Sequence, residues 1–350
     1  MTTDRSGNND PAELRDFNEE ELFAGISGAL ALRPKIEQIV DEIWNSGFDG
    51  IYFTGIGGTY ASAMQAEVYM RGRSGLPVYA ENAAEFITTG RKRFTSRSIV
   101  ICSSVSGTTK EMLAMAEKAH TLGARIFAFV DTPATPLAET ADWVISYPQN
   151  EQLKFYMTCS YLMYLNHEFD DYSEYCRQME QYLAEGLVNV EKESDAWARA
   201  YAEKTAADLR QNPDMPHYFI ASGNQYGAAY SCAMCYWAEQ LWIKSICVSA
   251  QEFFDGMLEI ITGNVPATLF VGEDEQRPLA ERVARFLPRV SENYVIIDTR
   301  DYAMTGIDEK YRGTVSHLIM RSVMNRVDAW LEYELDHSRS IRRYYRRFDY

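Results

Sequence analysis

Five hydroxyl side chains gather around one glycine in the first third of the chain, a composition typical of an anion-binding loop. They follow an apolar run at residues 98–102 and surround Gly107, and they are Ser103, Ser104, Ser106, Thr108 and Thr109. A helical pattern comes next, so the free N–H groups of a helix start would converge with the hydroxyls on one spot. Serine and threonine also serve as ordinary helix caps, but one cap needs fewer hydroxyls than this loop offers. We therefore interpret the loop as a cradle for a phosphate group.

A carboxylate suited to proton transfer lies much later in the chain. Glu239 occupies an aromatic and apolar stretch, residues 236–241, within a predicted helix. Such surroundings raise the pKa of a carboxylate, which suits a general base. A glutamate on the outer surface of a helix would have the same spacing, so the residues alone leave both interpretations open.

A glycine-rich loop at residues 55–59 offers a second interpretation of the first third of the chain. The loop begins the G-x-G-x-x-G pattern of dinucleotide-binding proteins, and Glu81 stands about where such a protein has its ribose-binding acid. The sixth position of the pattern is Tyr60, however, whose bulk blocks the close packing that the motif needs. A dinucleotide site would also leave the hydroxyl loop unexplained, so we disfavour it.

The elements that position these residues form a repeated pattern of short apolar strands and helices. Such alternation predicts α/β architecture, with parallel, doubly wound sheets in a three-layer, flavodoxin-like arrangement. The predicted strands are 50–54, 76–80, 98–102, 125–130 and 143–147 in a first unit, and 217–222, 245–249, 267–271 and 294–298 in a second. Gly55 precedes Glu85 by 30 residues, and Gly223 precedes Glu252 by 29. We infer an internal duplication.

The two copies differ at the loop after their third strand. Where the first copy has its hydroxyl cluster, the second has Gly272, Glu273, Asp274 and Glu275. Carboxylates at that position would repel a phosphate. The sequence therefore predicts an anion site in the first copy alone.

This pattern divides the chain into five parts. They are a polar arm over 1–19, a first α/β domain over 20–165, a helical connector over 166–212, a second α/β domain over 213–336 and an Arg- and Tyr-rich tail over 337–350. We expect the first helix over about 20–46 and the last over about 314–335.

The overall charge excludes several classes of partner. The chain has 34 Lys and Arg against 50 Asp and Glu, a net charge of −16, which repels the phosphate backbone of nucleic acids. No apolar run approaches the ~20 residues of a membrane span, and the polar start lacks a secretion signal. We expect no nucleic-acid or membrane partner and a cytoplasmic location. The tail is the exception, with five arginines among residues 339–347, suited to docking on the acidic body or to holding an anionic substrate.

These motifs together resemble the sugar isomerase (SIS) domain family. The residues that carry the resemblance are Gly-Gly-Thr at 57–59 and Ser-Val-Ser-Gly-Thr-Thr at 104–109, loops similar to those of the isomerase half of glucosamine-6-phosphate synthase. The likeness is closer still to the fructoselysine-6-phosphate deglycases, which act on phosphorylated Amadori compounds. Their Glu-Phe-Phe-His-Gly segment is similar to residues 252–256, and their Arg-Arg-Tyr tail to residues 342–344. The resemblance implies two tandem SIS domains, a homodimer or higher homo-oligomer, and no metal or organic cofactor.

The resemblance also implies roles for individual residues. Carried over by position, it assigns binding of the sugar phosphate to Gly57, Gly58, Thr59, Ser104, Ser106, Thr109 and, from the tail, Arg343. It makes Glu239 the base, because Glu239 stands 16 residues before position 255, the family's spacing to a histidine that acts as acid across a dimer. Here Asp255 replaces that histidine, and an ordinary aspartate, with a pKa of ~3.9, is a poor acid near neutral pH unless it is buried. His337, at the start of the tail, is the alternative acid.

The activity so implied is that of a deglycase or isomerase acting on a 6-phosphorylated fructosamine. Glu239 would move a proton from C1 to C2 of the sugar, and hydrolysis would then release an aldose 6-phosphate and a free amine or amino acid. Two alternatives stay open. One is a sugar-phosphate-binding protein without catalysis, which the loss of the histidine would suit. The other is a simple aldose–ketose phosphate isomerase.

Overall fold

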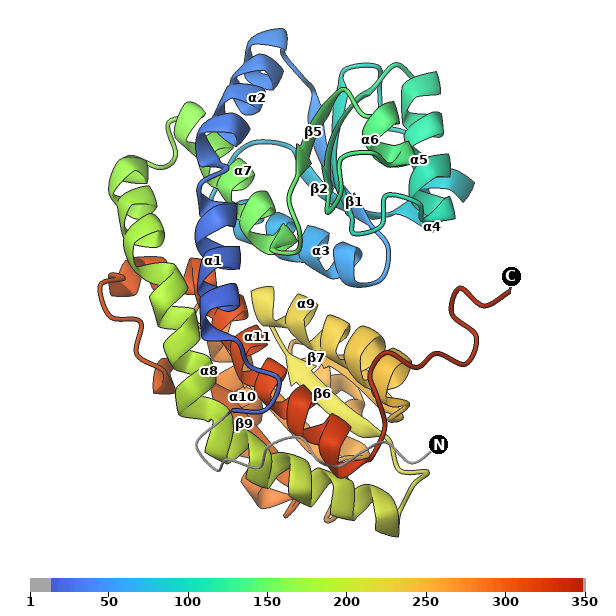
Figure 1. Ribbon diagram of the computed structural model, residues 1–350, viewed down its shortest axis with the longest axis vertical. Coiled ribbons are helices and arrows are strands. Elements are labelled where there is room, and N and C mark those ends of the chain that lie inside the picture. The colour runs from blue at the N-terminus through green and yellow to red at the C-terminus, as the bar shows by residue number, and fades with distance from the viewer. Residues whose placement is uncertain (1–13, 349–350) are drawn as a thin grey trace.

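Two parallel sheets, one in each half of the chain, form the centre of the molecule. The computed structural model describes residues 14–348, and Figure 1 shows the two halves one above the other. The first sheet has the order β2-β1-β3-β4-β5 and the second has the order β7-β6-β8-β9. The predicted fold class is therefore confirmed. The shared order of the first four strands also agrees with an internal duplication.

The strands lie close to their predicted positions. They are β1 (Gly50–Gly55), β2 (Val78–Asn82), β3 (Ser98–Ser104), β4 (Arg125–Val130), β5 (Trp143–Ser146), β6 (His217–Ala221), β7 (Ser245–Ser249), β8 (Ala267–Val271) and β9 (Tyr294–Asp298). β1 and β3 of the first sheet are buried along their whole length. Strands covered by helices on both faces need apolar side chains on both faces, which is why they read as continuous apolar runs in the sequence.

Helices cover both faces of each sheet. In the first half they are α1 (Glu19–Leu30), α2 (Arg33–Ser46), α3 (Gly58–Arg71), α4 (Ala83–Thr88), α5 (Lys110–Thr121), α6 (Pro136–Thr140) and α7 (Glu151–Leu165). Next come α8 (Tyr172–Gln211), α9 (Asn224–Ser231), the π-helix η1 (Cys232–Leu241), α10 (Arg277–Phe286) and α11 (Glu309–Glu334). Short 3₁₀ turns are η2 (Phe253–Asp255), η3 (Met257–Glu259), η4 (Leu287–Arg289) and η5 (Thr299–Asp301). None of the helices within residues 14–348 combines the length and the apolar character that a bilayer span requires.

Two helix predictions were wrong in detail. The single helix expected over 20–46 is split into α1 and α2, with the break at Ala31 and Leu32. Pro34 in the first turn of α2 explains the break, because proline has no N–H to continue a preceding helix. The last helix, α11, begins at Glu309 rather than near Thr314. The predicted polar arm falls mostly on residues 1–13, outside the described residues, and the domain boundaries as such stay a prediction.

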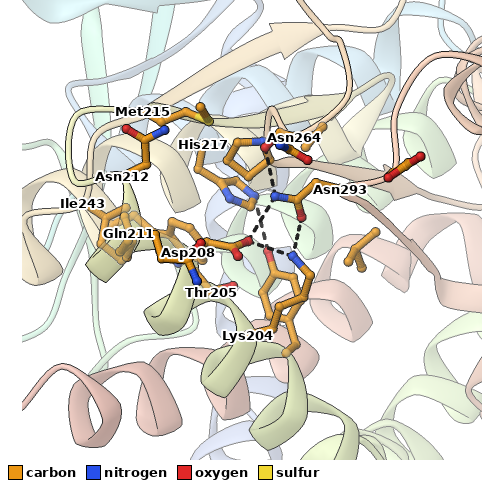
Figure 2. A pocket seen from close by; sticks show the side chains of 17 residues that line it. Lys204, Thr205, Asp208, Gln211, Asn212, Met215, His217, Ile243, Asn264 and Asn293 are labelled. Carbon is orange, nitrogen blue, oxygen red and sulfur yellow. Dashed lines mark hydrogen bonds and ion pairs between the residues drawn. The ribbon is translucent and has the colours of Figure 1, made fainter.

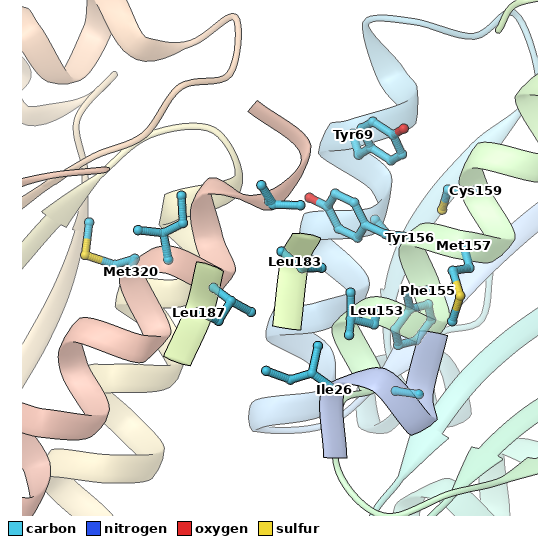
Figure 3. Close-up of a cluster of buried hydrophobic side chains, with 14 of the residues drawn as sticks. Ile26, Tyr69, Leu153, Phe155, Tyr156, Met157, Cys159, Leu183, Leu187 and Met320 are labelled. Carbon is cyan, nitrogen blue, oxygen red and sulfur yellow. The ribbon is translucent and has the colours of Figure 1, made fainter. Parts of the chain in front are cut away.

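One hydrophobic core runs through both halves of the molecule. Helix α8 extends along both sheets in Figure 1. Its Leu183 and Leu187 are buried in a cluster that includes Phe155 of α7 and Met320 of α11. In Figure 3 the two leucines lie between Met320 on one side and Phe155 on the other. Because side chains from both halves share this core, the two sheets are held in a fixed relation to each other.

His317 lies in this core between the halves. Its ring stacks on Tyr156 at 4.4 Å between centroids, and only 2% of the residue is exposed. Neither ring nitrogen has a hydrogen-bond partner among the described residues. Burial lowers the pKa of His317 from 6.5 to about 3, because a charged imidazolium would lose its hydration there.

This burial makes stability depend on pH. The unfolded chain takes up a proton near pH 6.5, whereas the folded chain keeps His317 neutral down to about pH 3, so the free energy of unfolding falls as the pH drops through that window. Between pH 6.5 and 5 the loss from this residue is about 1–2 kcal/mol. His317→Phe keeps the stacked ring and removes the titration, so it should reduce the loss of stability on acidification.

Urea unfolding midpoints at pH 7 and pH 5 measure this effect. The exposed His167 provides the control, because His167→Asn should leave the pH dependence of the parent unchanged. Equal pH dependence in His317→Phe and the parent would show that His317 does not contribute to the loss of stability.

Candidate functional site

The loops at the carboxyl ends of β1 and β3 open into a cleft of about 1060 Å³. These two strands are neighbours in the sheet, and the chain order reverses between them. Ligands of open parallel sheets bind at such a switch point, because the loops on either side diverge and leave a crevice. The cleft is lined from the first half by Gly57, Gly58, Asn82, Thr108, Thr109, Lys110 and Glu111, and from the second half and the tail by Tyr230, Met234, Cys235, Glu239, Tyr345, Arg346, Arg347 and Phe348, among others.

The hydroxyl loop is organised by its own hydrogen bonds. Ser104 ends β3, and its Oγ accepts a hydrogen bond from the N–H of Gly107 at 3.2 Å and lies 3.5 Å from Oγ1 of Thr109. Ser106 Oγ accepts from both the N–H and the hydroxyl of Thr108, at 3.3 and 3.0 Å. The hydroxyls thus hold one another in place before any ligand arrives.

Gly107 is required by the shape of this loop. Its φ of +60° lies in the left-handed region, and a Cβ there would come within 2.2 Å of the Thr135 hydroxyl oxygen. A side chain at this position would therefore strain the backbone and push Thr135 away.

The helix that follows the loop begins without a side-chain cap. Thr109 is the N-cap residue of α5, and its hydroxyl makes no cap hydrogen bond to the first turn. The start of a helix carries a partial positive charge and N–H groups that suit an anion. Together with Thr108 and Thr109, which line the cleft, this helix start has the chemistry of a phosphate site.

In the second half, a carboxylate of the chain itself occupies the corresponding place. The helices that follow β1 and β6 begin alike, since Gly57 and Gly223 have φ values of +61° and +60°. At the start of α9, however, Asp274 accepts hydrogen bonds from the N–H of Asn224 at 2.6 Å and of Gln276 at 2.9 Å. Burial raises the pKa of Asp274. The acidic loop thus covers the start of α9, whereas the equivalent start of α3, at Gly57 and Gly58, lines the open cleft.

Glu239 reaches the same cleft from the second half. It lies on η1, where a regular α-helix was expected, and sustained π-helix is rare and often found at functional sites. Its Oε1 accepts a hydrogen bond from Nε of Arg342 at 2.9 Å, and 30% of its side chain is exposed. One turn earlier, burial and the charge of Glu239 raise the pKa of the Cys235 thiol to about 11. Glu239 therefore has an ionic partner, Arg342, that the apolar sequence around it did not indicate.

The tail passes over the cleft. The arginine that it brings to the hydroxyl loop is not the one that the sequence predicted. In Figure 1 the tail rises from the end of α11 toward the first half. Arg346 donates from Nη2 to Ser106 Oγ at 2.9 Å. Arg343 instead lies over the ring of Trp242, with its guanidinium carbon 3.9 Å from the centroid, and is not among the described residues that line the cleft. The structure therefore places Arg346, not Arg343, where an anion could be held.

Five other predicted residues are not among the described residues that line this cleft: Thr59, Ser104, Ser106, Asp255 and His337. The two serines belong to the hydroxyl loop, of which Thr108 and Thr109 reach the lining. The Thr59 hydroxyl closes its own turn, because it bonds to both N–H and C=O of Ile56 at 3.1 Å. Asp255 is exposed at the end of η2. His337 donates from Nε2 to the carbonyl of Gln240 at 2.9 Å. The acid role that the resemblance implies for position 255 requires a partner subunit, because the family's acid acts across a dimer.

Sequence reasoning missed some residues of the cleft. Asn82 could have been found, because it ends β2 at the same edge of the sheet as the two loops. Arg342 and Arg346 could not be told apart from the other tail arginines, since nothing in their spacing shows which of them faces the cleft. Tyr230 and Cys235 come from the second half and meet the first only in the fold.

Comparison with known proteins identifies the family. The sequence pattern of the SIS domain matches residues 46–166. The chain contains a SIS domain. It is 27% identical to fructosamine deglycase FrlB of Bacillus subtilis over 329 residues, covering 90% of this chain and 97% of that one. It is 26% identical to the fructoselysine 6-phosphate deglycase of Escherichia coli over 320 residues, covering 89% of this chain and 90% of that one.

Solved structures show the same relationship for the whole SIS-domain chain. A candidate phosphosugar isomerase of Bacillus subtilis superposes with a TM-score of 0.81 at 26% identity, over 95% of this chain and all of the other. The C-terminal domain of glucosamine-fructose-6-phosphate aminotransferase from Francisella tularensis gives 0.71 at 12% identity, over 91% of this chain and 95% of the other, which shows a shared fold. The predicted resemblance is confirmed, and the relatives are phosphosugar isomerases and deglycases.

The positions of the tail arginines give a testable contrast. Arg346→Met should weaken binding of glucose 6-phosphate about tenfold, because it removes one charge-assisted contact beside the hydroxyl loop. Arg343→Met should leave the affinity unchanged, since Arg343 lies on Trp242. Isothermal titration calorimetry measures both. If only Arg343→Met lost affinity, Arg343 rather than Arg346 would bind the phosphate, as the sequence predicted.

Proposed function

We propose that this protein is a deglycase of 6-phosphorylated fructosamines, which releases an aldose 6-phosphate and a free amine or amino acid. The observation that supports the proposal most is that Glu239 and the end of the hydroxyl loop, Thr108 and Thr109, line one cleft although they come from opposite halves of the chain. A phosphate site alone would suit any sugar-phosphate-binding protein. A carboxylate facing the same space adds a group able to move a proton on the bound sugar.

The phosphate is placed on the hydroxyl loop. Its negative charge would lie at the start of α5, with hydroxyl donors from Ser104, Ser106 and Thr109 and the guanidinium of Arg346 on the open side. In the second half the loop that follows β8 is acidic, and its Asp274 accepts a hydrogen bond from the N–H of Asn224 at the start of α9, so the chain supplies its own anion there. The substrate is therefore bound in one orientation, with its phosphate toward the first half and its carbon skeleton toward η1.

The reaction then needs one base, one acid that protonates the C2 carbonyl oxygen, and one molecule of water. Glu239 takes a proton from C1 of the open-chain ketoamine, and the electron pair of that C–H bond forms the C1–C2 double bond of an enaminol. Glu239 returns the proton to C2, which leaves an imine at C1. Water adds to the imine, and the C–N bond breaks to give the aldose 6-phosphate and the amine. The C2 carbonyl already makes the C1–H bond acidic, so the proposed steps use no cofactor.

The ion pair with Arg342 fits this role for Glu239. The guanidinium of Arg342, at 2.9 Å, holds the Glu239 carboxylate in a defined position in the cleft. Because Arg342 belongs to the tail that also carries Arg346, a substrate that draws the tail onto its phosphate would also adjust the surroundings of the base.

The acid that assists the carbonyl oxygen has two candidates. Asp255 would have to come from a partner subunit, as the family resemblance implies for this position. His337 would have to leave its hydrogen bond with Gln240. The exposed position of Asp255 also favours the alternative function, in which the protein binds a sugar phosphate without converting it.

The role of Glu239 is tested by Glu239→Gln, which keeps the size of the side chain and removes the base. Turnover should fall about a thousandfold, the usual contribution of a general base, while glucose 6-phosphate still binds. Release of amine from a panel of 6-phosphorylated fructosamines measures the activity. Glu117 on the exposed surface of α5 gives the control, because Glu117→Gln should retain full activity.

The outcomes separate the proposals. Equal activity of Glu239→Gln and the parent would remove Glu239 from the mechanism. Binding with no amine release from any member of the panel, by the parent protein itself, would favour the binding protein. Interconversion of simple ketose and aldose phosphates, without amine release, would indicate an isomerase.

A further inference from the structure

A second cavity, of about 490 Å³, lies at the amino ends of the strands of the second sheet, and we propose that it binds a small zwitterion of the amino-acid type. We call it the amino-end cavity. It lies at the opposite ends of these strands from the loop that carries Asp274, and its volume is in the range of small-molecule sites. The proposal does not depend on the function proposed for the catalytic cleft.

The walls of the amino-end cavity come from several elements that meet there. The last turns of α8 contribute Lys204 and Asp208, and the first residues of strands contribute His217 and Ala267. Asn293, just before β9, closes one side. Figure 2 shows the side chains of Lys204, Asp208 and Asn293 converging next to His217.

These polar groups form a network that a ligand can reach. Lys204 Nζ donates to Asp208 Oδ2 at 2.7 Å and also to Asn293. Asn293 Nδ2 donates to Asp208 and to the carbonyl of Asn264, both at 3.0 Å. The side chains of Lys204 and Asp208 are 51% and 35% exposed, so neither charge is sealed inside the protein.

The charges around the amino-end cavity indicate which class of ligand would fit it. Lys204 supplies one positive charge, and Asp208 and Glu292 supply two negative ones. His217 adds none near neutral pH, because burial lowers its pKa to about 3. A phosphate would face two carboxylates, and an uncharged sugar would bring no charge to match Lys204 or Glu292. An amino acid matches them, with its carboxylate near Lys204 and its ammonium near Asp208 and Glu292.

The remaining wall is apolar and suits a side chain. It includes Leu209, Met215, Trp237 and Ile243. Trp237 packs against His217 at 4.6 Å between ring centroids, and it belongs to η1, the same π-helix that carries Glu239. A molecule in the amino-end cavity would therefore contact the back of the helix whose other side faces the catalytic cleft.

A binding experiment on the full-length protein tests the proposal. The standard L-amino acids are screened by thermal shift, and the best binder is measured by calorimetry beside its amide and its deaminated acid. We expect at least one amino acid to bind, and both derivatives to bind about tenfold more weakly because each lacks one of the two charges. Saturating glucose 6-phosphate should not displace it, since that ligand occupies the catalytic cleft.

Substitutions of residues that line the amino-end cavity test whether the amino acid binds there. Lys204→Met and, independently, Asp208→Asn should each weaken binding about tenfold, while Lys35→Met, an exposed lysine on α2, should not change it. Melting curves check that each variant is folded. The proposal is overturned if no amino acid binds, if the amide binds as well as the free amino acid, if glucose 6-phosphate displaces the ligand, or if neither variant alters binding.

Discussion

The start of a helix at the carboxyl edge of a parallel sheet attracts an anion, and this chain builds such a site in each of its halves. In the second half the anion is part of the protein, because the carboxylate of Asp274 accepts a hydrogen bond from the N–H of Asn224 at the start of α9. In the first half the loops contain glycine, serine and threonine, and the space between them stays open as a cleft. A duplicated fold has thereby become asymmetric, with a single place for a negatively charged ligand.

The chemistry at that place needs the other half of the molecule. Glu239 lies on η1, which packs against the second sheet, yet it faces the cleft at the end of the first. The distance between a phosphate held by the first half and a carboxylate held by the second is set by the core that both halves share. Helix α8 contributes to that core along both sheets. A change that loosened this core would disturb the relative position of phosphate and base without touching either.

The sequence allowed the fold to be predicted well, because its main signals are local. Apolar runs gave the strands, and the matching distances from Gly55 to Glu85 and from Gly223 to Glu252 indicated the duplication. The rule that carboxyl ends of parallel strands share one edge brought the loops at 57–59 and 104–109 together, and the cleft agrees with it.

The details that could not be predicted depend on long-range packing. The tail arginines have the same local sequence character, yet Arg342 pairs with Glu239, Arg343 stacks on Trp242 and Arg346 reaches Ser106. The π-helical form of η1 has no periodic pattern that marks it. The amino-end cavity joins residues from α8 to β9 that are far apart in the chain. The break between α1 and α2, by contrast, could have been predicted from Pro34.

The most direct measurement is a crystal structure with a stable substrate analogue, a hexitol with an amine at C1 and a phosphate at C6. The account predicts the phosphate at the start of α5, among the hydroxyls of residues 104–109, and C1 within about 3.5 Å of the Glu239 carboxylate, the separation needed for proton transfer. A phosphate bound anywhere else, or a Glu239 carboxylate that points away from the bound carbon chain, would contradict it.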